Sequence, residues 1–348
     1  MRIKLFEDFA LLGDACYTTS FQITTNMSKV TALFTFALVA LSVASNSNDV
    51  WIEMFSIQMT QAVENDLPLL PELAKNLGLN SLYKSIVKAK LADALSAAGP
   101  FTVFGPTDAA FYALPEWAKK AIANVTVLSK VLEYHVINGK ISFSDLENMD
   151  EKLVHTLIGK PLRVNFYPNN KVITAQCSPI DSNNADKMAS NGVLHEIARV
   201  VIPPPGTIVD AITACPVFKT LVKAIAAADL TSSFSEKGPF TLFAPTDAAF
   251  EKLPSGELDK LLKNKTLLVE VLMYHTVPLT YCSPGLVSYT NLTTLIGQTL
   301  AVTVSGDRIK INNAQVIPNG ADGSVTNGVV HAIDQVLLPP DFLHRSRV

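Results

Sequence analysis

The sequence predicts an α+β protein built from two similar domains in tandem. A block at residues 99–111 returns at 238–250 with eleven of its thirteen positions identical. Within each copy, helical patterns come first, and short alternating segments typical of strands come later. Because the two copies are spaced by about 140 residues, the size of an ordinary domain, each copy is expected to fold as one unit.

Two shorter landmarks define the extent of the domains. A Tyr-His pair occurs at 134–135 and 274–275, and an Asn-Gly-Val run occurs at 191–193 and 327–329. We therefore place the domains at 66–204 and 205–340. The run Pro-Pro-Pro-Gly at 203–206 joins them and is expected to be a stiff connector that restricts their relative motion.

Local signals predict the first elements of each copy. The β-branched and aromatic run at 101–104 predicts a strand. Thr107 and Asp108 supply an N-cap oxygen for the helix that follows them. Residues 128–135 carry apolar side chains at helical spacing on a face that ends in His135. The second copy repeats each of these signals.

The later part of each copy predicts strands. Apolar and polar residues alternate at 162–166, 171–174, 300–304 and 308–311. Further strands are expected after the two Asn-Gly turns.

Composition excludes one class of partner. The chain has 348 residues, of which 28 are basic and 31 acidic, so its net charge is −3. No run of Lys and Arg forms the positive stripe that a nucleic acid backbone requires. With 48% apolar residues the chain has ample material for folded cores, and no nucleic acid partner is expected.

No catalytic function is expected either. The segment His195-Glu-Ile-Ala-Arg199 has an arginine where the zinc protease motif has its second histidine, and the second copy reads His331-Ala-Ile-Asp-Gln335. No nucleophile elbow, phosphate-binding loop or dinucleotide fingerprint occurs. We expect no catalytic residue, no metal site and no cofactor.

The N-terminal part predicts secretion. An apolar run at 30–44 follows Lys29 and ends in small residues, which is typical of a signal peptide cleaved near Ala44 or Ser45. We assign residues 27–45 to this signal and residues 1–26 to an upstream extension, with Met27 or Met1 as the start. The run is too short for a stable membrane anchor, and the C-terminal end has no apolar tail. The protein is therefore expected in the extracellular space or matrix.

Cysteine use is consistent with an oxidising compartment. Cys16 precedes the signal, so Cys177, Cys215 and Cys282 remain in the mature chain. Three thiols allow one disulfide and one leftover cysteine. We expect Cys215 to pair with Cys282, because both lie in the second copy. The alternative is three unpaired cysteines.

The three ordered landmarks, each present twice and followed by a Pro-Pro pair, resemble the fasciclin domain family over about 275 residues. The resemblance implies that each domain is a wedge-like β-sandwich with helices packed along it. It also implies a largely extracellular cell adhesion or matrix protein, similar to the periostin and keratoepithelin group. The implied partners are cell-surface receptors, integrins included, matrix components, or further copies of the chain. The alternative is a secreted carrier of a small apolar or glycan ligand.

The resemblance also implies binding residues. In animal members, integrin binding is assigned to an Asp-Ile motif before the Asn-Gly block, which falls here on Asp186 and Asp322, without the isoleucine. It is also assigned to the Tyr-His region, which here comprises Tyr134, His135, Tyr274 and His275. Because both histidines end an apolar helical face, we expect buried imidazoles instead. We expect the Thr107-Asp108 turn to hold His135.

Three sequons and one loop complete the candidate sites. N-glycosylation is expected at Asn124, Asn264 and Asn291, and the first two occupy the same place in the repeat. The loop that contains Cys282 and Gly285 departs most from the first copy. If one domain alone binds a partner, that loop is where the contact is expected.

Overall fold

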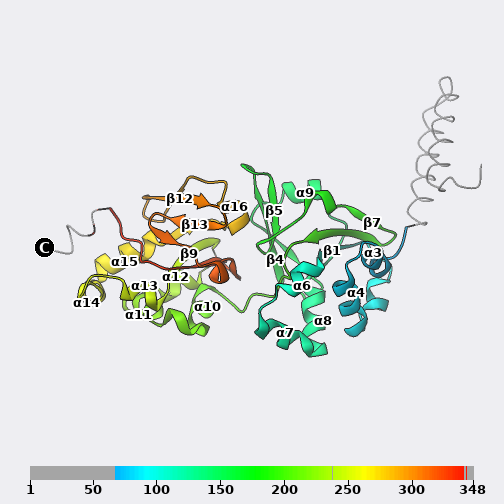
Figure 1. The fold of residues 1–348 in the computed structure, drawn as a ribbon, viewed down its shortest axis with the longest axis horizontal. Helices are drawn as coiled ribbons and strands as arrows, with labels where there is room; N and C mark the ends of the chain where they lie inside the picture. Colours follow the sequence, from blue (N-terminus) through cyan, green and yellow to red (C-terminus); the bar gives the residue numbers. More distant parts are fainter. Residues whose placement is uncertain (1–66, 237, 341, 343–348) are drawn as a thin grey trace, which may run out of the picture. The chain divides into compact units, whose positions relative to one another are not determined.

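The computed structural model describes residues 67–236, 238–340 and 342 (Figure 1). The predicted extension 1–26, the predicted signal 27–45 and Cys16 lie outside the described residues. We call residues 67–204 the first repeat and residues 205–340 the second repeat.

Within the described part of the chain, no helix combines the length and the apolar character that crossing a membrane requires.

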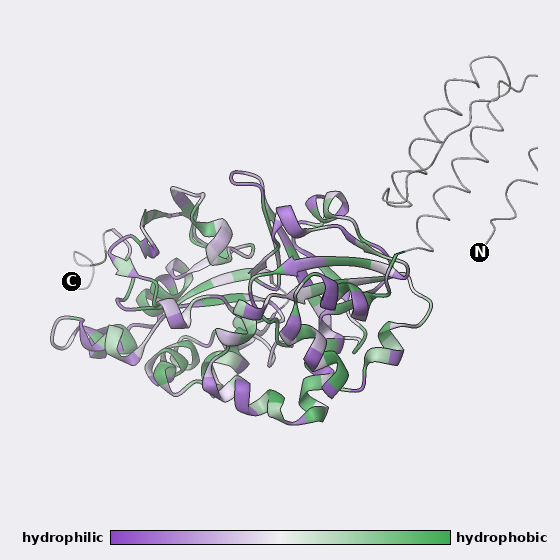
Figure 2. Cartoon of the chain, turned by 45° about the vertical axis from the view of Figure 1, so that its right-hand side comes forward, coloured by the Kyte–Doolittle hydropathy of each residue, from purple (hydrophilic) through white to green (hydrophobic). Residues whose placement is uncertain are grey.

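Both repeats begin with helices and alternate them with short strands, which confirms the predicted α+β class. The first repeat contains α3 (Leu70–Asn76), α4 (Asn80–Lys88), α5 (Ala92–Leu95), α6 (Asp108–Tyr112), α7 (Glu116–Ala123), α8 (Val125–Tyr134) and α9 (Phe143–Glu147). The second repeat contains α10 (Ile208–Ala214), α11 (Lys219–Ala227), α12 (Thr231–Ser235), α13 (Asp247–Glu251), α14 (Glu257–Lys263), α15 (Lys265–Tyr274) and α16 (Ser283–Leu286). The helices alternate between hydrophobic and hydrophilic residues along their length, as amphipathic helices on a core do (Figure 2).

Each repeat has a first sheet of four strands in equivalent order. In the first repeat the order is β2 (Val136–Asn138), β1 (Phe101–Pro106), β8 (Gly192–Ile197) and β7 (Lys187–Ala189). In the second repeat it is β10 (Thr276–Pro278), β9 (Phe240–Pro245), β16 (Gly328–Ile333) and β15 (Gly323–Val325). The central pairs β1–β8 and β9–β16 are parallel, whereas the flanking pairs are antiparallel.

Each repeat also has a second, antiparallel sheet. The first repeat orders it as β3 (Lys152–His155), β4 (Pro161–Tyr167), β5 (Val172–Ala175) and β6 (Ser178–Pro179). The second repeat orders it as β11 (Asn291–Thr293), β12 (Thr299–Ser305), β13 (Arg308–Ile311) and β14 (Ala314–Gln315). The four alternating segments predicted as strands correspond to β4, β5, β12 and β13.

The layers of a repeat follow from the alternation of side chains along its central strand. In β1, Val103 belongs to the cluster packed under helices α3, α4 and α8, whereas Phe104 belongs to the cluster that reaches Leu162 and Val164 of β4. The first sheet therefore lies between the helices and the second sheet, and the two sheets form a sandwich. The second repeat has the same two clusters.

The helix that ends in the Tyr-His pair is fixed by its histidine. His135 is 1% exposed. Its Nδ1–H donates to the Val131 carbonyl at 2.7 Å, and its Nε2 accepts the Val201 N–H at 3.0 Å. His275 makes the same contacts with Val271 and Leu337. Because one ring nitrogen donates a hydrogen bond and the other accepts one, the ring carries a single N–H and is neutral.

The predicted partner of His135 was wrong. Thr107 caps α6 by accepting the Ala110 N–H, and Asp108 accepts the Ser81 N–H at 2.7 Å. Both side chains therefore accept hydrogen bonds from the first turns of helices. The hydrogen-bond partners of the imidazole are instead backbone groups in the last turn of α8 and after β8. Burial lowers the pKa of His135 and of His275 to about 4.

These depressed histidine pKa values predict acid sensitivity. In the unfolded chain each histidine takes up a proton as the pH falls below its ordinary pKa of about 6.5. In the folded chain the same histidine is not protonated until the pH reaches about 4. Stability is therefore lost as pH falls through this window, by about 3 kcal/mol for each histidine. His135→Phe should remove one of these contributions and, because it leaves the Val201 N–H without an acceptor, lower stability at pH 7 by about 1–3 kcal/mol.

Urea unfolding at a series of pH values from 7 to 4 measures both effects. His155→Gln, at an exposed position, is the matched control and should behave like the unaltered chain. Equal stability and equal acid slope in His135→Phe would contradict the buried role of the imidazole.

Candidate functional site

Strands β4 and β5 of the second sheet of the first repeat are buried on both faces. Leu162 and Val164 of β4 face the core of their own repeat, while Arg163, Asn165 and Tyr167 point the other way and are also buried. At the corresponding places in β12 the side chains on the outer face, Ala301, Thr303 and Ser305, are exposed. The outer face of β4 is covered because it docks onto the second repeat.

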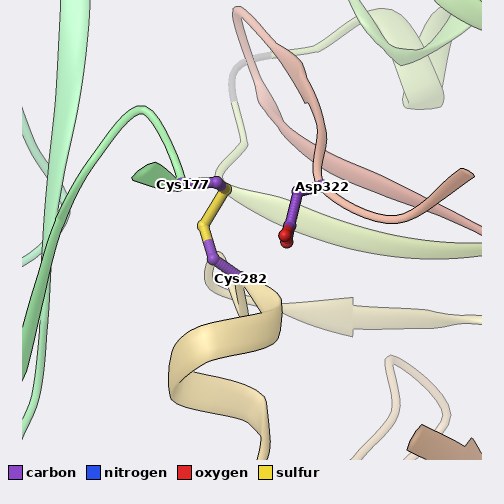
Figure 3. Close-up of side chains that lie close together, drawn as sticks. All are labelled: Cys177, Cys282 and Asp322. Atoms are coloured by element: carbon purple, nitrogen blue, oxygen red, sulfur yellow. A yellow bond between two sulfur atoms is a disulfide. The ribbon is translucent and has the colours of Figure 1, made fainter. Parts of the chain in front are cut away.

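A disulfide closes this junction between the repeats (Figure 3). Cys177 follows β5, and Cys282 is the N-cap of α16; their Cα atoms are 5.2 Å apart, within the usual range for a disulfide. Both are buried. The predicted pairing of Cys215 with Cys282 was wrong. Cys215 ends α10 and packs with the helical cluster of the second repeat, whereas Cys282 packs with Tyr167 and Cys177.

Tyr167 is the side chain that enters the second repeat most deeply. Its hydroxyl donates to the Thr280 carbonyl at 2.9 Å and accepts the Cys282 N–H at 2.8 Å. Its ring lies against Gly285, where a Cβ atom would come within 2.2 Å of the ring. Only glycine leaves room for this ring. In the first repeat Asp145 stands at the corresponding place, so the loop that differs most between the copies is the loop that receives Tyr167.

A buried ion pair supports the same junction. Arg163 Nη1 donates to Glu151 Oε2 at 3.0 Å, and Arg163 Nη2 donates to the Thr326 carbonyl at 3.1 Å. Glu151 also accepts the Thr280 N–H. Burial raises the pKa of Glu151, and this backbone hydrogen bond together with Arg163 limits the rise. Losing either charged partner would leave the other buried and uncompensated.

Each repeat holds an aspartate in the same position beside a histidine. Asp186 and Asp322 have positive φ angles of 51° and 58°. Each backbone N–H donates to the Nδ1 of a histidine at 3.2 Å: His195 in the first repeat and His331 in the second. Nε2–H of these histidines donates to the carbonyls of Ile141 and Tyr281, both at 2.8 Å. The histidines thus fix the backbone that presents each carboxylate.

The carboxylate itself caps the same helix in both repeats. Asp186 Oδ1 accepts the Phe143 N–H at 2.9 Å, and Asp322 Oδ1 accepts the Ser283 N–H at 2.6 Å. The second oxygen differs. Asp322 Oδ2 accepts from the Ser283 hydroxyl and from Arg199 of the first repeat, and the Asp322 side chain is 4% exposed, whereas that of Asp186 is 47% exposed.

The charge of Asp322 is maintained by its neighbours. Burial alone would raise the pKa of Asp322, but the charge that His331 carries at low pH, the charge of Arg199, and hydrogen bonds from Arg199 and Ser283 outweigh it and hold the pKa below its usual range. Burial lowers the pKa of His331, so this ring is neutral near pH 7. Arg199 is therefore the charge that balances Asp322.

The Tyr-His residues that the sequence suggested for binding lie in the cores. Tyr134 and Tyr274 are buried, and their hydroxyls donate to the carbonyls of Pro161 at 2.8 Å and Thr299 at 3.2 Å. His135 and His275 are buried beside them. None of these four side chains is on the accessible surface of the described structure, so they hold helix and sheet together rather than meet a receptor.

One group of side chains with metal-ligating atoms occurs in the described part of the chain: Cys177, Cys282 and Asp322, whose ligand atoms lie within 4.8 Å of one another (Figure 3). The two sulfurs are bonded to each other and carry no thiolate charge, and both Asp322 oxygens already accept hydrogen bonds. These residues do not fit a metal ion.

The three predicted glycosylation sites are exposed. Asn124 and Asn264 are the N-caps of α8 and α15, where their Oδ1 atoms accept backbone N–H groups. Asn291 begins β11 at an exposed position. Glycan attachment at these positions stays a prediction.

Two segments of the chain match one protein family. A model described as the fasciclin domain matches residues 77–203 and 216–339. Transforming growth factor-beta-induced protein ig-h3 from Sus scrofa is 33% identical over 252 residues, which is 72% of this chain and 36% of that protein. Periostin from Homo sapiens is 34% identical over 254 residues, which is 72% of this chain and 30% of that protein. The chain thus spans about a third of the length of these relatives.

A shorter similarity is found to a bacterial protein, and one solved structure is also similar. Protein sll1483 from Synechocystis sp. is 44% identical over 136 residues, covering 38% of this chain and 74% of that protein. A FAS1 domain pair from the insect cell adhesion molecule Fasciclin I is 20% identical, covers 77% of this chain and 99% of that chain, and gives a TM-score of 0.37. That score is too low to bear on the fold.

The junction predicts a specific disulfide pattern. Proteolysis of the oxidised chain should release one peptide in which Cys177 is linked to Cys282, with Cys215 alkylated without reduction. Because the bridge spans a sequence separation of 105 residues, Cys177→Ser should lower stability by about 3–5 kcal/mol on the chain-entropy model. Cys215→Ser is the control and should leave stability unchanged.

Mass spectrometry of the peptides and urea unfolding provide the two measurements. A peptide linking Cys215 to Cys282 would contradict the junction described above.

Proposed function

This chain belongs to the fasciclin domain family, and on that premise we propose that it is a secreted, non-enzymatic adhesion or matrix protein. The observation that carries the proposal is the disulfide between two tandem fasciclin repeats. A buried Cys177–Cys282 bridge persists in an oxidising compartment and would be unusual in the cytosol. It holds two binding modules at one fixed spacing, which suits a protein that connects a cell surface to a matrix.

The arrangement of polar groups supports a binding role rather than a catalytic one. The buried histidines each use both ring nitrogens on backbone groups, so they hold structure and offer no free base. The exposed carboxylate of Asp186 is the polar group of the predicted set that a partner can reach. Cell-surface receptors and matrix proteins are the partners that we propose.

The carrier alternative has weaker support. Two surface depressions of about 420 and 430 Å³ lie on the second repeat. Their volumes are within the range of small-molecule pockets. However, both are open depressions on the surface whose lining includes the charged residues Asp247, Lys219 and Lys223, and neither is an enclosed apolar cavity. A carrier would be expected to bury most of its ligand.

The proposal predicts that cells attach to the purified protein. The full chain, secreted from eukaryotic cells and coated on a surface, should support attachment several-fold above an albumin coating. Cys215→Ser should retain this activity, whereas Cys177→Ser should lose part of it because the repeats are no longer held together.

Attachment equal to albumin for several cell types would contradict the proposed function. Native mass spectrometry of the same preparation provides the complementary test, since a stoichiometric bound small molecule would favour the carrier.

A further inference from the structure

Three buried side chains at the junction between the repeats have polar atoms without a protein partner. They are Asn165 of β4, Thr174 of β5 and Thr280 of the second repeat, which are 1%, 0% and 3% exposed. Among the described residues, neither polar atom of the Asn165 side chain has a hydrogen-bond partner, and neither of the two threonine hydroxyls has one. Burying such groups unpaired is costly, because each loses the hydrogen bonds that it makes with water in the unfolded chain.

The three side chains are grouped around the hydroxyl of Tyr167. Asn165 and Thr174 lie directly opposite each other in the register of β4 and β5, and Asn165 and Tyr167 share the face that docks onto the second repeat. Burial raises the pKa of Tyr167, and the Thr174 hydroxyl is near enough to oppose this rise without completing a hydrogen bond. The Tyr167 hydroxyl donates to the Thr280 carbonyl at 2.9 Å.

The chemistry of this group selects water over an ion. The Asn165 amide has N–H donors as well as an acceptor oxygen, and each hydroxyl can donate or accept. A cation would leave the N–H donors unpaired, and an anion would leave the amide oxygen unpaired. The carboxylate of Glu151 does not balance a bound cation, because it already accepts from Arg163 and from the Thr280 N–H. A water molecule donates and accepts at once, and a buried water typically makes about three hydrogen bonds to such groups.

The second repeat shows what the same positions carry when they face solvent. Thr303 and Lys310 lie opposite each other in β12 and β13, and both are exposed. They occupy the places that Asn165 and Thr174 occupy in the first repeat. Docking has buried the first pair, yet both residues are polar, whereas the neighbouring Val172 is apolar and packs beside the disulfide. Polar side chains at buried positions are the expected choice where a junction encloses water.

We propose that the junction contains a water site in which Asn165 and Thr174 of the first repeat and Thr280 of the second bind at least one ordered water molecule. This water joins the two repeats through hydrogen bonds that the three side chains do not make with one another. Such a bridge is nearly as favourable in enthalpy as a direct hydrogen bond. The proposal is independent of the proposed function, because it requires no partner of the chain.

Water–amide nuclear Overhauser spectroscopy of the ¹⁵N-labelled full chain tests the site in solution. The side-chain amide of Asn165 should show a cross peak to water of the sign that a long-lived, buried water gives. Asn191 is the matched control, because it is also buried and its Nδ2 donates to the carbonyls of Leu95 and Ala97 at 2.8 and 2.9 Å. It should show no such peak. The absence of a peak at Asn165, or equal peaks at both asparagines, would overturn the proposal.

A crystal structure at a resolution that defines ordered water distinguishes a bound water from an exchanging hydroxyl. It should show a water within about 3 Å of Asn165 and of at least one of the two threonine hydroxyls. An Asn165 amide bonded directly to Thr174 or Thr280, with no water beside it, would contradict the water site even if a cross peak is observed.

Replacing Asn165 with leucine, which has nearly the same size, gives a result whose sign is informative. If water pairs the amide in the folded chain, Asn165→Leu loses these hydrogen bonds, and the midpoint of urea unfolding falls. If the amide is buried unpaired, leucine removes a penalty, and a higher midpoint would rule out the water site. Thr303→Leu, at the exposed equivalent position, is the control and should leave the midpoint unchanged. The two measurements on the unaltered chain decide the question if Asn165→Leu does not fold.

Discussion

The burial of the outer face of β4 against the second repeat is the constraint on which the rest of the structure depends. That face carries Arg163, Asn165 and Tyr167, which a lone domain would expose to water. Burying such groups is costly unless each finds a partner. The second repeat supplies the partners for two of them: backbone carbonyls at Thr280 and Thr326 and the N–H of Cys282.

This constraint explains why two repeats with the same fold differ where they do. The first repeat contributes Arg163, Tyr167 and Cys177 to the junction. The second repeat contributes Cys282 and Gly285 at the start of α16. The corresponding positions in the other copy carry unrelated residues. The same asymmetry leaves Asp186 exposed and Asp322 covered, although both are held by an identical hydrogen-bonding frame.

Much of the fold could be predicted from the sequence, because it depends on local patterns. The patterns that predicted it were the duplicated block, the cap at Thr107 and the apolar helical face that ends in His135. Each of them reflects interactions between residues of the same repeat. The junction could not be predicted in the same way. Alternation in β4 looks the same whether its polar face meets water or another domain, and three cysteines do not specify their own pairing. The divergence of the loop with Cys282 and Gly285 indicated one side of the junction, but no local pattern showed that Tyr167 and Cys177 of the first repeat would meet it.

The most direct test of the docked arrangement is NMR residual dipolar couplings measured on the oxidised full chain. If the outer face of β4 is buried as described, couplings from both repeats fit a single alignment tensor on the structure of the whole chain. Two different tensors, with each repeat fitting only by itself, would show that the repeats move independently and would contradict the account.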